Sequence, residues 1–95
     1  MMTISLDLMK IWFTEWKDNK PLESIVIENY EEDTRTHKVL SALEEACYKF
    51  DLMVPIWLDS SITSFKRHSR ARFTSDAFVE EIPFDYLEIR VLEED

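Results

Sequence analysis

The sequence contains no glycine at all. Phosphate-binding loops and dinucleotide-binding fingerprints depend on glycine, because only glycine lets the backbone approach a phosphate closely in those turns. The sequence therefore excludes nucleotide-binding proteins of these two classes.

Cysteine and histidine are also scarce. Cys47 is the single cysteine, and His37 and His68 are the two histidines. One cysteine cannot form an intramolecular disulfide, which is typical of proteins in a reducing cytoplasm. These three residues include no close zinc-type pair, so we expect neither a metal site nor another cofactor. We expect Cys47 to be a small, buried, apolar residue on a helix.

Long apolar runs are missing as well. The run from Leu52 to Leu58 is far shorter than the roughly 18 residues that a membrane-spanning helix needs. The N-terminus lacks a positively charged start and carries Asp7 within its apolar part, which argues against a secretory signal. We therefore expect a cytoplasmic protein without membrane contact.

The residues that are present indicate one folded domain, 1–95. The chain is 45% hydrophobic and 33% charged, a balance typical of globular proteins even at a net charge of −9. Met9, Ile11 and Phe13 alternate with more polar positions and predict a strand over residues 3–16. The apolar face of this run switches near Met9, so residues 1–8 are a possible N-terminal extension.

A turn and a second strand follow. Residues 17–21 contain Asp, Asn and Pro, which favour turns. Ile25 and Ile27 then share one face of an alternating run. Together the two runs predict a β-hairpin.

The clearest helix begins at Asp33 or Thr34. Its apolar residues recur at spacings of three and four and predict one buried face: Leu40, Leu43, Ala46, Cys47 and Phe50. Lys38, Ser41 and Glu44 are polar, so we expect the opposite face to be solvated. This helix should cover one face of the sheet.

The second half of the chain gives weaker signals until its end. Because Pro55 has no amide to donate, residues 52–58 are predicted to form an edge strand or an extended loop. A short helix is expected from Ser60 or Ser61 to His68, and a helical turn from about residue 75 to residue 81. The alternation in residues 84–93 predicts the final strand, with Leu87, Ile89 and Val91 on one face and Tyr86, Glu88 and Arg90 on the other.

These elements predict a two-layer α+β fold. The sheet would be small and mostly antiparallel, with three or four strands. One long helix would pack on one face, accompanied by one or two short helices.

Basic residues gather in one stretch without Asp or Glu, residues 60–75. We take five of its residues as candidate contacts for an anion or a partner: Lys66, Arg67, His68, Arg70 and Arg72. They can instead pair with the chain's own surplus carboxylates or with a second subunit. Phosphate or nucleic-acid contact is a further alternative, since Arg forks match phosphate oxygens and Phe65 or Phe73 could stack on bases.

Trp12 and Trp16 fall on the strand face opposite Ile11 and Phe13. If the helix covers the latter face, the two tryptophans need other cover, because contiguous exposed aromatic surface usually marks an interface. They are therefore interface candidates for a homodimer or a protein partner. The alternative is that they pack under residues 52–83 of the same chain.

No catalytic residue can be assigned. About ten residues of helix separate His37 from Cys47, which is about 15 Å of rise and about 80° of rotation. An enzyme would need a pocket in which a histidine meets an acid or the thiol: His37 or His68 with Asp59, Asp85 or Cys47.

Five segments of the chain carry a resemblance: residues 16–21, 29–37, 55–59, 65–68 and 84–89. Together they resemble a group of small, acidic, uncharacterised proteins from gut Clostridia and related Firmicutes. The resemblance covers residues 9–95. It implies a bacterial cytoplasmic origin and assigns no activity to any position.

From these features we expect a non-enzymatic binding or assembly module. The alternative is an acidic protein that acts on nucleic-acid machinery, through the basic stretch or by carboxylates that mimic the phosphates of DNA. A small enzyme is a third possibility.

Overall fold

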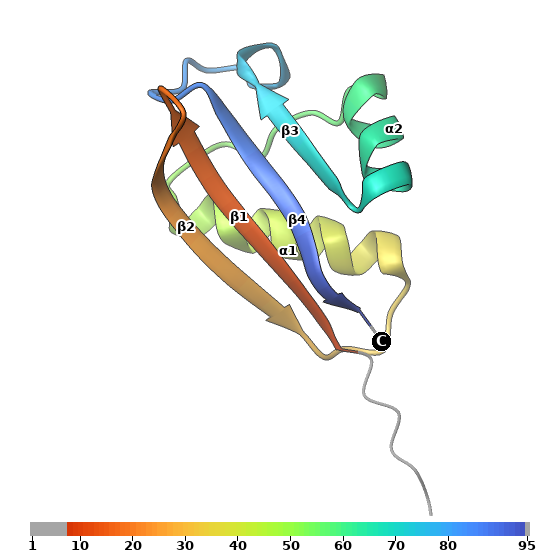
Figure 1. Ribbon diagram of the computed structural model, residues 1–95. Coiled ribbons are helices and arrows are strands. Elements are labelled where there is room, and N and C mark those ends of the chain that lie inside the picture. The colour runs from red at the N-terminus through yellow and green to blue at the C-terminus, as the bar shows by residue number, and fades with distance from the viewer. Residues whose placement is uncertain (1–7, 95) are drawn as a thin grey trace, which may run out of the picture.

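A computed structural model describes residues 8–94 and shows an α+β fold with a four-stranded antiparallel sheet (Figure 1). The elements are, in chain order, β1 (Met9–Lys17), β2 (Lys20–Asn29), α1 (Arg35–Lys49), α2 (Asp59–His68), β3 (Arg70–Thr74), the 3-10 turn η1 (Ser75–Ala77) and β4 (Tyr86–Glu94). The strands lie in the order β2-β1-β4-β3. The α+β class and the antiparallel sheet are as predicted, although the two helices, of 15 and 10 residues, differ less in length than expected. Neither helix is long and apolar enough, within residues 8–94, to cross a lipid bilayer.

The predicted hairpin is confirmed. Asp18 and Asn19 have φ angles of 51° and 63°, so both central residues of the turn adopt the left-handed region that tight hairpin turns require. The backbone N–H of Asp18 donates to the Asp85 side chain at 2.9 Å, which ties the turn to the start of β4. The first part of the predicted strand, up to residue 7, lies outside the described residues.

Helix α1 begins as predicted, with Thr34 as its N-cap. The Thr34 hydroxyl accepts from the His37 backbone N–H at 3.2 Å, and the Asp33 carboxylate accepts from the Thr34 N–H at 2.7 Å. Cys47 is fully buried, as expected. At the other end, Glu45 and Lys49 form an i,i+4 ion pair at 3.5 Å.

The predicted buried face of α1 was partly wrong. Leu40 is 40% exposed, whereas Lys38, expected in solvent, is 5% exposed. The helix instead packs through one stripe at helical spacing: Val39, Ala42, Leu43, Ala46 and Cys47. Leu40 lies about 100° around the helix from Val39, which moves it off this stripe.

The second half of the chain departs further from the prediction. Residues 52–58 form no strand, and the expected helical turn ends at Ala77. The fourth strand is β3, which was not predicted, because only Ala71 and Phe73 mark its buried face. Trp57 packs edge-on against Phe73, with ring centres 4.8 Å apart, so the extended segment contributes to the core.

The core lies between the sheet and the helices. Figure 1 shows α1 crossing behind the strands and α2 beside β3. Five fully buried side chains on the sheet face that the helices cover form its centre: Ile11, Phe13, Phe73, Leu87 and Ile89. As predicted, the last strand directs Leu87 and Ile89 inward.

Helix α2 covers the β3 edge of the sheet. The Ser61 hydroxyl donates to the Arg72 carbonyl at 3.0 Å, and the Ser64 hydroxyl donates to the Arg70 carbonyl at 2.8 Å. Exposed strand edges invite pairing with other chains, and these bonds occupy the outward carbonyls of β3.

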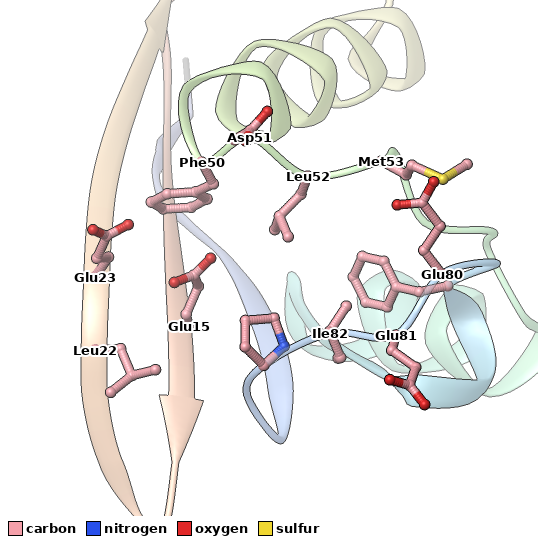
Figure 2. Close-up of a pocket in the computed structure, with 12 residues that line it drawn as sticks. Glu15, Leu22, Glu23, Phe50, Asp51, Leu52, Met53, Glu80, Glu81 and Ile82 are labelled. Atoms are coloured by element: carbon pink, nitrogen blue, oxygen red, sulfur yellow. The ribbon is translucent and has the colours of Figure 1, made fainter.

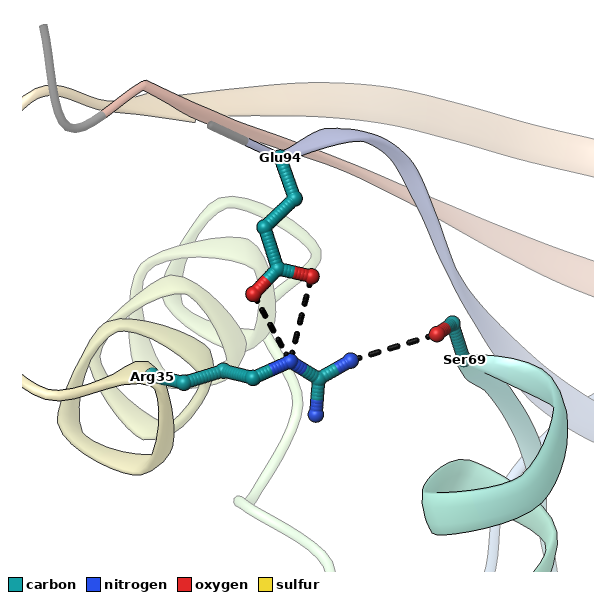
Figure 3. A network of polar contacts seen from close by, with 3 residues as sticks. All are labelled: Arg35, Ser69 and Glu94. Atoms are coloured by element: carbon teal, nitrogen blue, oxygen red, sulfur yellow. Dashed lines mark hydrogen bonds and ion pairs between the residues drawn. The ribbon is translucent and has the colours of Figure 1, made fainter.

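The side chain of Arg35 joins three elements of the fold (Figure 3). Its Nε lies 2.8 Å from a Glu94 carboxylate oxygen, and its Nη2 donates to the Ser69 hydroxyl at 3.2 Å. Its guanidinium carbon also lies 4.9 Å from the centre of the Phe65 ring. The start of α1, the end of α2 and the end of β4 are thereby held together.

Replacing Phe13 with Ala should lower the free energy of unfolding by about 3 to 5 kcal/mol, because the side chain is fully buried at the centre of the sheet. Urea denaturation measures this change. The control is Tyr48→Ala on the exposed side of α1, which should stay within about 0.5 kcal/mol of wild type. A similar loss in both variants would contradict the described core.

Replacing Arg35 with Ala should lower the free energy of unfolding by about 1 kcal/mol, since the Glu94 pair is partly exposed and screened by solvent. Denaturation of Arg35→Ala at low and high salt tests this. Most of the loss should persist in high salt, because the Ser69 bond and the contact with Phe65 do not depend on the ion pair. If high salt abolished the loss of stability in Arg35→Ala, the described contacts of Arg35 with Ser69 and Phe65 would be contradicted.

Candidate functional site

The sheet has one face that the helices leave uncovered, here called the open face. Successive residues of a strand alternate between faces, so the partners of the buried core residues mark it. It comprises Lys10, Trp12, Thr14 and Trp16 of β1, Ser24, Val26 and Glu28 of β2, Arg70, Arg72 and Thr74 of β3, and Tyr86, Glu88 and Arg90 of β4.

Aromatic rings occupy the two central strands of the open face. Trp16 and Tyr86 are cross-strand partners whose rings stack with centres 6.4 Å apart. The Trp16 indole N–H donates to the Glu88 carboxylate at 3.0 Å, which fixes the ring's orientation. Both predicted interface tryptophans therefore lie on this face, and the alternative of packing under residues 52–83 is wrong.

Arginines lie over these rings. The guanidinium carbon of Arg72 is 4.7 Å from the Tyr86 ring centre, and that of Arg90 is 5.9 Å from the Trp12 ring centre. Arg70 stands directly opposite Arg90 in the strand register. Such contacts between cations and aromatic faces hold the arginines near the sheet. Arg72 also stands opposite Glu88 in the strand register, although the two form no ion pair.

The arginines of the open face form no ion pair with a carboxylate within residues 8–94. Lys10, at one end of this face, forms ion pairs with Glu28 at 3.9 Å and Glu93 at 3.7 Å. No ion pair in this part of the chain involves Arg70, Arg72 or Arg90. The expected pairing of the basic stretch with the chain's own acids is therefore not what holds these residues in place.

The five predicted contact residues form two groups. Lys66, Arg67 and His68 are exposed in the last turn of α2, where positive charge suits the helix dipole. Ser69 then adopts a left-handed conformation with φ 56° and ends the helix. Beyond it, Arg70 and Arg72 lie on the open face, so only these two join the aromatic residues.

Arg90 belongs to the candidate site but was not selected from the sequence. Its alternation with Tyr86 and Glu88 placed the three on one face of the final strand. The missing information was the pairing of β4 with β3, which brings Arg90 beside Arg70.

A polar hollow of about 400 Å³ adjoins the open face between α2 and β3. Here called the Ser–Arg hollow, it is lined by Ser60, Ser61, Ser64, Arg70, Ala71, Arg72, Thr74 and Glu88. The Ser61 and Ser64 hydroxyls already donate to β3 carbonyls, and Glu88 adds a negative charge. The two guanidinium groups are therefore the part of the lining that suits a carboxylate or a phosphate group. The predicted anion-contact residues thus border a recess as well as a flat surface.

The residues weighed for catalysis lie apart from this site. His37 Nδ1 is 2.9 Å from the Asp33 carboxylate at the exposed start of α1. Burial, followed by the nearby charge of Glu15, raises the pKa of the Cys47 thiol to about 11, so the thiol stays protonated at neutral pH. Within residues 8–94, no group of three or more His, Cys, Asp and Glu side chains could hold a metal ion.

Comparison with known proteins adds no assignment to this site. The chain matches no protein-family model, and neither a curated protein nor a solved structure shows significant similarity to it. The resemblance to the clostridial group stays a prediction.

Replacing Thr14 with Val should raise the free energy of unfolding by about 1 kcal/mol. The Thr14 hydroxyl is buried on the open face and has no hydrogen-bond partner among residues 8–94, and such groups carry a desolvation cost. Urea denaturation checks this, with Thr63→Val on exposed α2 as the control. A loss of stability specific to Thr14→Val would contradict the described surroundings of the hydroxyl.

Proposed function

We propose that this protein is a non-enzymatic, cytoplasmic binding or assembly module whose open face docks an acidic segment of another protein. The observation that carries the proposal is the set of unpaired arginines on an aromatic surface: Arg70, Arg72 and Arg90. They stand out in a chain whose net charge is −9.

Charge and composition both support an acidic protein partner. Guanidinium groups form two parallel hydrogen bonds with a carboxylate, which gives strong and oriented contacts. Trp, Tyr and Arg are the residues that contribute most often to binding energy at protein interfaces. Trp12, Trp16 and Tyr86 supply the aromatic part, and a positive patch steers an acidic partner toward it.

The ring faces favour a protein over single-stranded nucleic acid. Base stacking needs free aromatic faces, whereas Tyr86 is in contact with both Arg72 and Trp16, and Arg90 lies over Trp12. The acidic remainder of the chain also repels a phosphate backbone. Nucleic-acid contact through the Ser–Arg hollow is the second candidate, and phosphate mimicry by carboxylates stays a prediction.

A symmetric homodimer through the open face is disfavoured by the same charges. A two-fold axis through the patch would bring Arg70, Arg72 and Arg90 of one chain near those of the other. Like charges across an interface cost affinity unless they are compensated. Light scattering at micromolar concentration tests the predicted homodimer, and a monomeric mass is the expected result.

Tryptophan fluorescence tests the proposed face, because Trp12 and Trp16 report on it. A short synthetic peptide of glutamate and phenylalanine should change the emission, and the affinity should fall as salt rises. In the double variant Arg72→Gln/Arg90→Gln, binding should weaken at least tenfold, or about 1.4 kcal/mol.

The matched control is Lys20→Gln/Lys49→Gln, which removes the same positive charge outside the open face and should bind as wild type does. Oligothymidylate is the second probe. Tighter binding of oligothymidylate than of the peptide would replace the proposal with the nucleic-acid candidate. Equal weakening in both double variants, or no response to either probe, would overturn it.

A further inference from the structure

A second hollow lies on the helix side of the sheet, away from the open face (Figure 2). Here called the Glu15 hollow, it has a volume of about 610 Å³, within the range of small-ligand sites. Three parts of the chain build it: the hairpin end of β1 and β2, the turn after α1, and residues 78–83. Its lining residues are Glu15, Leu22, Glu23, Phe50, Asp51, Leu52, Met53, Phe78, Glu80, Glu81, Ile82 and Pro83.

Glu15 is an unusual lining residue, because it is an acid that is largely buried. The residue is only 7% exposed, and within residues 8–94 its carboxylate has no hydrogen bond or ion pair. Figure 2 shows this carboxylate pointing from β1 toward Phe50 and Leu52. The carboxylate oxygens keep some contact with solvent, but a largely buried acid without a partner still loses solvation. The position is therefore better suited to holding a ligand than to stabilising the fold.

A second carboxylate, that of Glu23, adds to the unfavourable free energy of the Glu15 carboxylate. Glu23 is the cross-strand partner of Glu15, and like charges in that relation repel. Burial, and then the charge of Glu23, raises the pKa of Glu15. Local rules of stability are most often broken at functional sites, and a cation between the two groups would relieve both penalties.

The remaining lining combines three further acids, Asp51, Glu80 and Glu81, with apolar side chains that indicate what kind of cation fits. Phe50, Leu52 and Ile82 are partly buried against the core and face the two carboxylates across the hollow (Figure 2). A hydrated metal ion gains nothing from these side chains, whereas methylene groups would be removed from water. The Phe50 ring additionally offers a face to a positive charge.

We propose that the Glu15 hollow binds an alkylammonium group. The ammonium lies between the carboxylates of Glu15 and Glu23, and the alkyl chain packs on Phe50, Leu52 and Ile82. The same chemistry is present in a free aliphatic amine and in the lysine side chain of a partner. The alkylammonium site does not depend on the open face. An experiment can therefore overturn the alkylammonium site without affecting the proposed function of the open face, and the reverse also holds.

Calorimetric titration with n-pentylamine tests the site. Wild type should bind it, and Glu15→Gln should bind at least tenfold more weakly. Glu44→Gln removes the same charge from the exposed side of α1 and should bind as wild type does. Ammonium chloride carries the charge without the alkyl chain and should compete at least tenfold less well.

Two further probes identify the source and exclude other sites. An acetylated and amidated Ala-Lys-Ala peptide that binds more tightly than n-pentylamine would assign the hollow to a partner's lysine. Calcium that displaces the amine at equal concentration would overturn the proposal in favour of a metal site. Equal weakening in Glu15→Gln and Glu44→Gln, or no binding of either amine, would also overturn it.

The Glu15→Gln variant should fold, which keeps the binding test interpretable. Because the pKa of Glu15 is raised in the folded state, the folded protein holds its proton more tightly than the unfolded chain. Its contribution to stability is thus present below the ordinary value of 4.5 and is lost as pH rises through the raised pKa. Several other titratable groups surround it from neighbouring elements: Glu23, Cys47, Asp51, Glu80 and Glu81.

Denaturation between acid and neutral pH measures this dependence. Wild type should lose stability relative to Glu15→Gln as pH rises, and Glu15→Gln should be the more stable protein at pH 7. The variant should also lack that part of the pH dependence. A neutral-pH stability below that of wild type would mean that the Glu15 carboxylate already has a partner, and would overturn the proposal.

Discussion

The pairing of β1 with β4 is the constraint on which the rest of the structure depends. These two strands come from opposite ends of the described chain, yet they are neighbours at the centre of the sheet. Their contact places Phe13 beside Ile89 on the covered face, and both are fully buried. The same register places Trp12 beside Arg90 and Trp16 beside Tyr86 on the open face. One pairing thus produces the core and the candidate site together.

This arrangement gives the two faces of the sheet different chemistry. On the open face, cations outnumber the carboxylates that contact them, because Glu88 is bound by Trp16 and the arginines lie over rings. On the helix side, Glu15 and Glu23 line a hollow of further acids and apolar side chains, without a described cation. The protein therefore carries two unbalanced charges of opposite sign on opposite sides of one sheet. Each imbalance suits an external group of the opposite charge.

Much of this fold could be predicted from local signals. The hairpin follows from Asp18 and Asn19 between alternating runs, α1 from the cap at Thr34 and its apolar spacing, and β4 from its alternation. Strand β3 could not be predicted, since two buried residues in a five-residue strand give too short a pattern. Only part of the candidate site could be predicted. Arg70 and Arg72 stood out by their charge, whereas Arg90 could be placed beside them only once the pairing of β3 with β4 was known. The Glu15 hollow depends on side chains from three distant segments, so no local pattern indicates it.

The central claim is that the open face is locally positive although the protein is strongly acidic. Quenching of tryptophan fluorescence by iodide and by caesium at low ionic strength tests this claim most directly. Trp12 lies under Arg90, and Trp16 stacks on Tyr86, which is in contact with Arg72. Iodide should quench more efficiently than caesium, the reverse of what a net charge of −9 alone would produce. More efficient quenching by caesium would show that the face is not positive and would contradict the account.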